Sequence, residues 1–277
     1  MGQHWRLILG GNRGAAFNMA VDEAILRACA GGDIPPTLRL YGFKRPAISL
    51  GYFQNVERAR IDIQYCRDAG IELVRRPTGG RAVLHGHDLT FSIVLHERRI
   101  PDSSKNVPSS HVWLVSGILA GLRLLGIQAE IGPNQSDQAG RGDSADCFAH
   151  VAQCDLRVGM RKVAGAAQVR KWGALLEQGS IPHMPLHVDY ERVFVGGSSN
   201  PQSERPPLLE VSREALEEAI VRGYEQSLDI HFEPTALSAG ELETAVELEK
   251  NKYAVADSDH INRQPKEPLL AVERVTG

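Results

Sequence analysis

The sequence has few cysteines, no long apolar run and no large excess of either charge. Four cysteines among 277 residues are too few for a disulfide scaffold, and no CxxC pair indicates a zinc or thioredoxin-like site. No run approaches the roughly 18 consecutive apolar residues of a membrane span. A net charge of -3 argues against a nucleic-acid partner held by a broad basic face.

The N-terminal segment also lacks the features of a signal peptide. Residues 1–17 contain neither the apolar core nor the cleavage site that such a peptide requires. We therefore expect a cytoplasmic protein with reduced thiols, no membrane partner and no nucleic-acid partner.

What the sequence does contain is the composition of a globular protein with mixed secondary structure. Apolar residues make up 42% of the chain and charged residues 23%, which are ordinary values. Apolar periodicity and capping residues predict helices from Asn18 to about Cys29 and over about 109–125, 212–227 and 238–252. The strand-like segments are 5–9, 37–41, 47–50, 71–76, 81–85, 89–96, 155–158 and 162–181.

This order of elements has no regular βαβ alternation. It therefore predicts an α+β fold, in which helices pack on a mixed or antiparallel β-sheet. We expect one catalytic domain over residues 1–253, including C-terminal helices at about 212–252, and a loosely attached tail over residues 254–277. The polar segments 132–145 and 196–207 are predicted to be loops, the first of them mobile.

A cluster of arginines and glycines follows one predicted strand, with the sequence RRPTGGRAVLH over residues 75–85. Gly79 and Gly80 permit positive φ and let a ligand approach the backbone closely. Exposed N–H groups in such a turn form a site for an anion or a carbonyl group. A hairpin turn with solvated arginines is the alternative, and the local pattern does not decide between them.

A second cluster, RKVAGAAQ over residues 161–168, places Lys162 at the start of a strand of small residues. Small side chains such as those at Gly165 and Ala166 leave room for an extended ligand. The alternative is a tight hairpin with a solvated lysine.

Cys147 is the candidate nucleophile, because it follows a polar loop and is expected to be accessible, whereas Cys29 and Cys66 fall inside helix patterns. A nearby ammonium would increase its thiolate fraction. Two alternatives have less support from the sequence. One is a thiol–imidazole pair of Cys147 with His85, and the other is a metal site that contains His85 and His87. No third metal ligand has a supporting spacing, so we predict no metal site.

These clusters together resemble the biotin/lipoate protein ligase superfamily over nearly the whole chain, from Trp5 to about Tyr253. The strings that carry the resemblance are FNMAVDEA at 17–24, LGYFQN at 50–55, RRPTGGRAVLH at 75–85 and KVAGAAQ at 162–168. Within the superfamily, the chain is most similar to octanoyltransferases of the LipM type. That likeness depends on RPTGGR at 76–81, LTFS at 89–92 and Cys147-Phe148, with Cys147 fifteen residues before Lys162.

The resemblance implies transfer of an octanoyl group from octanoyl-acyl carrier protein to a lysine of a lipoyl domain, typically the glycine cleavage H protein. It implies that Cys147 forms an acyl-thioester, that Lys162 assists, and that no cofactor is required. The remaining residues expected to bind substrate are Arg76, Thr78, Gly79, Gly80, Arg81, His85, Gly165 and Ala166.

Three other functions remain open from the sequence. An ATP-dependent lipoate–protein ligase would use the glycine loop and Lys162 without needing a cysteine. An amidotransferase that moves acyl groups between lipoyl domains would use the same Cys147. A non-catalytic binding module is disfavoured because both Cys147 and Lys162 are present.

Overall fold

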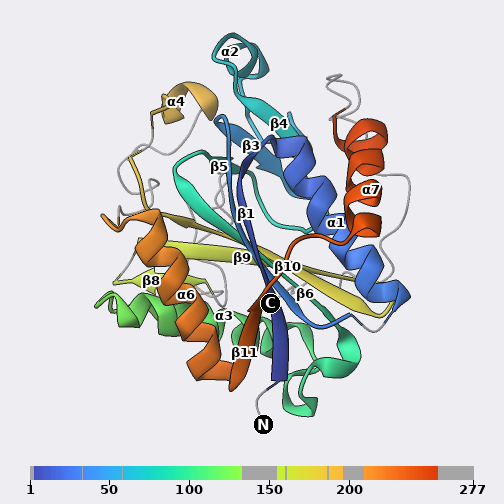
Figure 1. Cartoon of the computed structure of the whole chain (residues 1–277). Coiled ribbons are helices and arrows are strands. Elements are labelled where there is room, and N and C mark those ends of the chain that lie inside the picture. Colours follow the sequence, from blue (N-terminus) through green and yellow to red (C-terminus); the bar gives the residue numbers. More distant parts are fainter. Residues whose placement is uncertain are drawn as a thin grey trace.

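A mixed β-sheet forms the centre of the computed structural model (Figure 1), which describes residues 3–32, 34–57, 59–132, 155–159, 161–185, 187–195 and 209–254. Among the described residues, the strand order of this sheet is β11-β1-β2-β6-β10-β9-β8-β7. The strands are β1 (Gln3–Arg13), β2 (Thr37–Phe43), β6 (Asp88–His96), β7 (Glu130–Ile131), β8 (Leu156–Val158), β9 (Arg161–Lys171), β10 (Ala174–Pro182) and β11 (Ile230–Pro234). Strand β1 is parallel to both of its neighbours, and the remaining pairs are antiparallel. The predicted α+β fold with a mixed sheet is confirmed.

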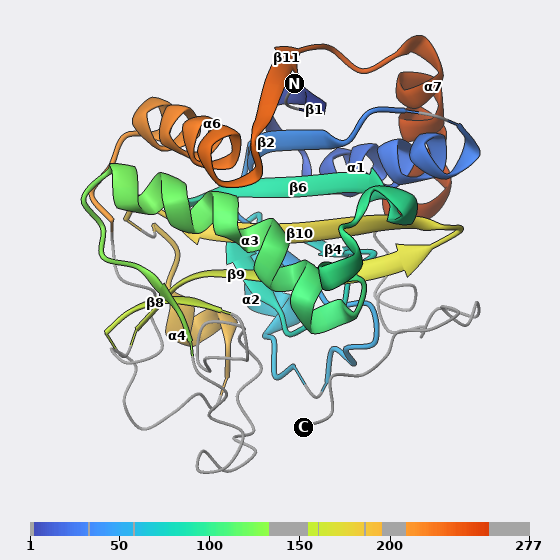
Figure 2. The ribbon, with the colours of Figure 1, turned by 90° about the horizontal axis from the view of Figure 1, so that it is seen from below.

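Helices cover both faces of this sheet (Figure 2). On one face lie α1 (Ala15–Gly31) and α7 (Ala239–Leu248), and on the other lie α3 (Val107–Leu124) and α6 (Arg213–Leu228). Strand β6 shows why the core has two halves: Phe91 and Ile93 pack toward α3 and α6, whereas Val94 packs toward α1. The period of two along a strand sends alternate side chains to opposite faces. None of the described helices combines the length and apolarity needed to cross a bilayer.

A smaller sheet lies at one end of the large sheet and supports the glycine-rich segment. It contains β4, β3 and β5 in that order, with β3 parallel to β4 and antiparallel to β5. Short helices α2 and α4 pack beside it (Figure 1). The bounds are β3 (Ala47–Leu50), α2 (Ile63–Asp68), β4 (Glu72–Arg75), β5 (Val83–His85) and α4 (Tyr190–Val193). Residues 76–82, which we call the glycine loop, connect β4 to β5.

Several boundaries differ from the sequence-based expectations. Asn18 is not the N-cap of α1, because the helix begins at Ala15, whose N–H donates to the Glu72 carboxylate at 2.6 Å. The strand predicted over 162–181 is a hairpin, divided by a turn at Trp172 and Gly173 into β9 and β10. Strand β11 was not predicted. The loops predicted over 132–145 and 196–207 lie almost entirely outside the described residues, as does the tail beyond Ala254.

The C-terminal elements pack on α1 through a buried carboxylate. Glu23 of α1 accepts hydrogen bonds from Lys252 at 2.6 Å and from the hydroxyl of Tyr253, both in the helical turn Glu249–Tyr253. Burial raises the pKa of Glu23, but Lys252, Tyr253 and Arg27 outweigh it, so the pKa lies below the usual value. Helix α7 begins with the predicted capping box, formed by Ser238 and Glu241.

Helices α3 and α6 approach closely because glycines face each other at their contact. A Cβ atom on Gly223 of α6 would collide with the carbonyl oxygen of Gly117. A Cβ atom on Gly121 of α3 would lie 2.7 Å from the carbonyl oxygen of Ala219. These contacts are with backbone atoms, which cannot move without separating the helices.

We expect Gly223→Ala to lower the free energy of unfolding by about 1–3 kcal/mol, because the added methyl group overpacks the helix contact. Urea denaturation measures this change. The matched control is Gly240→Ala in α7, where a Cβ atom would meet nothing within 4 Å. That change should stabilise the protein by about 0.5–1 kcal/mol through helix propensity. Equal effects of the two substitutions would contradict the close packing of α3 and α6.

Candidate functional site

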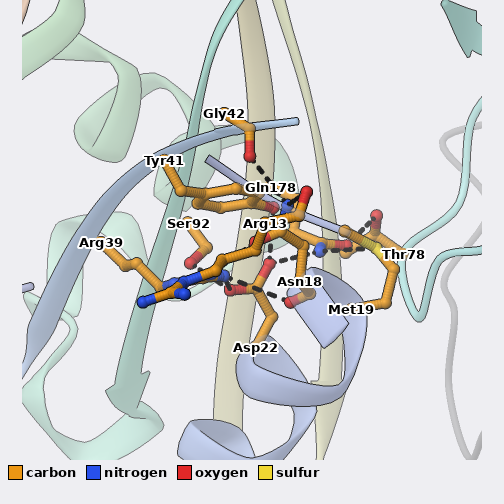
Figure 3. A network of polar contacts seen from close by, with 10 residues as sticks. All are labelled: Arg13, Asn18, Met19, Asp22, Arg39, Tyr41, Gly42, Thr78, Ser92 and Gln178. Carbon is orange, nitrogen blue, oxygen red and sulfur yellow. Dashed lines mark hydrogen bonds and ion pairs between the residues drawn. The ribbon is translucent and has the colours of Figure 1, made fainter. Parts of the chain in front are cut away.

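The carboxylate of Asp22 in α1 is the centre of a buried polar network (Figure 3). Its oxygens accept hydrogen bonds from four side chains on three strands of the large sheet. The donors are Arg39 Nη1 at 2.7 Å, Ser92 Oγ at 2.8 Å, Tyr41 Oη at 2.8 Å and Gln178 Nε2 at 2.7 Å. A buried carboxylate is tolerated when such donors replace its lost hydration. Asn18, predicted as a cap, instead accepts from Arg39 Nη2 at 2.7 Å.

Gln178 extends this network to the glycine loop. Its Oε1 atom accepts from the Thr78 hydroxyl at 2.9 Å, while its amide nitrogen donates to Asp22 (Figure 3). Thr78 is fully buried, and its carbonyl oxygen accepts from the backbone N–H of Tyr52 at 2.9 Å. The hydroxyl of Thr78, which we predicted to bind substrate, therefore fixes the loop against β10.

Arg76 binds the carbonyl oxygens of the glycine loop. Its guanidinium donates to the carbonyl oxygens of Gly79 at 2.5 Å, Arg81 at 2.8 Å and Ser49 at 2.8 Å. In a planar trans peptide the C=O and the following N–H point in opposite directions. Because these carbonyl groups face Arg76, the N–H groups of Gly80 and Ala82 point away from it. Arg76 was predicted to bind substrate. In the structure its guanidinium orients the amide groups of the glycine loop.

The glycines of the loop have distinct surroundings. Gly80 has a φ of +88°, a conformation that favours glycine. Its carbonyl oxygen occupies the place that a Cβ atom on Gly51 would take, so the loop packs directly on the segment after β3. A Cβ atom on Gly79 would meet nothing within 4 Å, so this position is open. Arg81 is half-buried beside it.

His85 lies in a chain of hydrogen bonds with the distances of a Ser-His-Asp triad. Its Nε2 atom is 2.8 Å from Ser49 Oγ, and its Nδ1 atom is 2.8 Å from Asp88 Oδ2. Ser49 is only 1% exposed and its hydroxyl also accepts from Arg76 at 3.1 Å, so no substrate can reach it. We assign His85 a bracing role, and its predicted contact with substrate stays a prediction.

The same bonds weaken the alternatives that involve His85. Both ring nitrogens already have partners, which disfavours a thiol–imidazole pair with Cys147. Within the described residues, no group of three His, Cys, Asp or Glu side chains could hold a metal ion.

Lys162 is a buried cation rather than a solvated one. Its Nζ atom lies 2.8 Å from Asp155 Oδ2, and the two side chains are 2% and 4% exposed. A Cβ atom on Gly165 would collide with Cε and Nζ of Lys162, so the lysine side chain crosses the bare Cα of this glycine. Gly165 was predicted to leave room for a ligand, but in the structure the room beside its Cα is taken by the Lys162 side chain. Asp155 was not predicted.

A bulge in β9 turns Lys162 to the face on which Gly165 lies. Leu156 of β8 pairs with Ala164, but Arg157 pairs with Lys162, so β9 contains one extra residue at Val163. Val163 and Ala164 consequently pack into the same core cluster, on the side of α3 and α6. Lys162 is directed to the opposite face.

Gly165 and Ala167 share this face, and the glycine loop lies over Ala167. A Cβ atom on Gly80 would be 3.7 Å from the Cβ atom of Ala167, and Ala167 pairs with Gln178 of β10. Two residues along a strand span about 7 Å. The glycine loop and Lys162 are thus neighbours on one face of β9. The side chain of Ala166, predicted to bind substrate, packs toward the opposite core, and Ala167 takes its place beside the loop.

Cys147 lies outside the described residues, but its segment begins and ends beside Lys162. The N–H of Gly132 donates to the carbonyl oxygen of Asp155 at 2.8 Å, and Ile131 pairs with Leu156. The two ends of the 22-residue segment 133–154 therefore lie side by side in the described structure. We call this place, where Gly132 meets Asp155, the neck of the segment. Cys147 precedes Asp155 by eight residues, which span at most about 28 Å.

Comparison with known proteins identifies the family. The model of the lipoyl protein ligase A/B catalytic domain matches residues 14–222. The chain belongs to this family. The octanoyltransferase LipM of Kyrpidia tusciae is 38% identical over 267 residues, which cover 89% of this chain and 95% of that protein. The LipM of Bacillus subtilis is 34% identical over 274 residues, which cover 90% of this chain and 95% of that protein.

Solved structures of lipoate protein ligases have the same fold. A bipartite lipoate protein ligase from Thermoplasma acidophilum has a TM-score of 0.75 and 25% identity, covering 97% of this chain and 100% of that one. A lipoate-protein ligase A solved with ATP has a TM-score of 0.75 and 28% identity, covering 94% of this chain and 99% of that one. The predicted superfamily and the predicted enzyme class, an acyltransferase, are confirmed.

A pH-dependent prediction follows from Asp88. Burial alone raises the pKa of this carboxyl, but the facing His85 and the Ser180 hydroxyl hold it well below its usual range. Since the pKa is lower in the folded than in the unfolded protein, the carboxylate stabilises the fold above about pH 5, and this contribution is lost as the pH falls below about 4. We expect Asp88→Asn to lower the unfolding free energy by about 3 kcal/mol at pH 7, and by less at pH 3.

Urea denaturation of both proteins at the two pH values measures this difference. Asp102→Asn is the control, because the Asp102 side chain is 99% exposed. That substitution should change stability little at either pH. A deficit of Asp88→Asn that does not depend on pH would refute the ionised, stabilising role of Asp88.

Proposed function

We propose that this protein moves an octanoyl group from octanoyl-acyl carrier protein to a lysine of a lipoyl domain, through a thioester on Cys147. The acceptor that we propose is the glycine cleavage H protein or another lipoyl domain. The observation that carries the proposal is the convergence of Lys162 and the glycine loop on one face of β9, next to the neck of the segment that contains Cys147. The octanoyltransferase relatives supply the substrate class.

The first half-reaction is an exchange of thioesters. The thiolate of Cys147 attacks the octanoyl carbonyl carbon, the carbonyl oxygen becomes an oxyanion, and the carrier's thiolate leaves with the electron pair. The N–H group of Gly80, which points away from Arg76 in an exposed part of the loop, is suited to donate to this oxyanion. Losing one such donor typically raises a barrier by about 3 kcal/mol.

The second half-reaction makes an amide. The neutral amine of the acceptor lysine attacks the carbonyl carbon of the Cys147 thioester, the carbon–sulfur bond breaks, and the departing sulfur takes up the proton that the nitrogen loses. The thioester is already activated, so neither half-reaction requires ATP. Lys162 has three N–H donors and can serve Asp155 and a reacting atom together. Since Asp155 balances its charge, we propose that Lys162 acts mainly at short range, through a directed hydrogen bond.

The acyl tail needs an apolar channel beside this site. Burying its seven carbons at about 0.8 kcal/mol each contributes roughly 5 kcal/mol, enough to select for chain length. Ala167 is a small residue on the face shared with the glycine loop, and we propose that it borders the tail.

A lipoate–protein ligase remains the second candidate, because the lipoate-protein ligase A solved with ATP shares the fold at 28% identity. In that function Lys162 would neutralise the charge of an acyl-adenylate. The cysteine dependence of the product distinguishes the two functions, as does the requirement for ATP. An amidotransferase would share Cys147 but would take its acyl group from a lipoyl domain.

We expect the purified protein to gain one octanoyl mass when it is incubated with octanoyl-acyl carrier protein without ATP. Intact mass spectrometry measures the gain, and Cys147→Ser should abolish it because the nucleophile is lost. Cys154→Ser, seven residues away, is the matched control and should keep the adduct.

Three outcomes would contradict the proposed function. Acylation that requires ATP and free octanoate would favour the ligase. Faster loading from an octanoylated H protein than from the carrier protein would favour the amidotransferase. A gain that survives Cys147→Ser would exclude the proposed thioester.

A further inference from the structure

We infer that Asp155 is a positioning residue for the transfer reaction, because it holds the ammonium of Lys162 in place. The Nζ–Oδ2 distance is 2.8 Å, and both side chains are at least nine-tenths buried. The kinetic consequences of this inference rest on the proposed function. The contact between Asp155 and Lys162 is independent of that function.

Gly165 and Asp155 together set the course of the Lys162 side chain. Its side chain crosses Gly165, where any larger residue would occupy the positions of Cε and Nζ. The second carboxylate oxygen of Asp155 lies on the same side, 3.3 Å from the place of a Cβ atom on Gly165. Lys162 thus has the bare backbone of β9 along its stem and a carboxylate at its end.

Asp155 also joins the lysine to the neck of the segment 133–154. Its side chain contacts Lys162, while its carbonyl oxygen accepts from the N–H of Gly132. One residue therefore fixes the ammonium and both ends of the segment that contains Cys147. Because these links are short, displacement of Asp155 moves the lysine relative to the base of that segment.

The physical need for Asp155 comes from burial. An ammonium removed from water is stable only when an anion and hydrogen-bond acceptors replace its hydration. Without the carboxylate, the buried lysine favours its neutral form or turns toward solvent. Either change removes a directed N–H donor from the site while leaving the glycine loop and its support chain intact.

We test this with Asp155→Asn, which keeps the shape and removes the charge, and Asp155→Glu, which restores the charge. The matched control is Glu130→Gln, which removes a carboxylate at the same neck, where Glu130 pairs with Arg157 at 3.1 Å. The measurement is the single-turnover rate of Cys147 octanoylation, followed by intact mass spectrometry over donor concentration and pH.

We expect Asp155→Asn to lower the limiting rate about tenfold or more, with the half-saturating donor concentration changed less than about twofold. The alkaline limb of its pH–rate profile should move to lower pH, because the ammonium has lost its counter-ion. Asp155→Glu should recover part of the rate, and Glu130→Gln should stay within about twofold of the wild type.

A second measurement does not depend on activity. In protein labelled with ¹⁵N at the lysine side chains, the buried Lys162 ammonium should give a slowly exchanging resonance, assigned by its loss in Lys162→Arg. We expect this resonance to vanish in Asp155→Asn and to persist in Glu130→Gln. Should Asp155→Asn fail to fold, the double variant Asp155→Asn with Lys162→Met removes the ammonium together with its carboxylate, and its recovered stability would support the pairing.

The outcomes separate this inference from the proposed function. A wild type that forms no octanoyl adduct, while the lysine resonance depends on Asp155, would overturn the function and leave the positioning role supported. An Asp155→Asn variant with wild-type rate, pH profile and lysine resonance would overturn the positioning role and leave the function unaffected. Equal losses in Asp155→Asn and Glu130→Gln would also overturn it, since the neck rather than the pair would then be responsible.

Discussion

One buried carboxylate, that of Asp22, connects helix α1, the large sheet and, through Gln178, the glycine loop. It lies between α1 and the large sheet, where four donors from β2, β6 and β10 surround it. Through Gln178 it reaches Thr78, so the glycine loop is anchored to the same point as the core. A buried charge of this kind stabilises one arrangement over others, because any slip of a strand leaves donors or acceptors unpaired.

Among the described charged residues near the site, Arg76 and His85 support the glycine loop, whereas Lys162 lies on the face of β9 that the loop covers. Arg76 donates hydrogen bonds to the glycine loop and to Ser49, and His85 is hydrogen-bonded to Ser49. The bonds from Arg76 set the direction of the loop amides. Lys162 reaches that face of β9 because a bulge redirects it and Gly165 leaves room for it. This arrangement suits a reaction that starts from an activated thioester, where orientation and oxyanion stabilisation contribute most of the rate.

The fold class, most helices and the glycine loop could be predicted from the sequence, because apolar periodicity, caps and paired glycines are local signals. The capping box at Ser238 and Glu241 is one example. The bulge at Val163 could not be predicted, since it arises from pairing with β8, and it decides which small residues face the loop. The hairpin at Trp172 was missed because tryptophan with a positive φ is an unusual turn residue. Asp155 was missed because an acidic residue at the start of a predicted strand resembles a solvated one until its burial is known.

The central claim is that the reacting carbonyl lies between the glycine loop and Lys162 on one face of β9. A crystal structure of the octanoylated enzyme tests this most directly. Our account predicts that the thioester oxygen lies about 3 Å from the Gly80 amide nitrogen, with Lys162 Nζ at hydrogen-bond distance from the oxygen or from the sulfur of Cys147. A thioester bound on the face of α3 and α6, or more than twice that distance from both groups, would contradict the account.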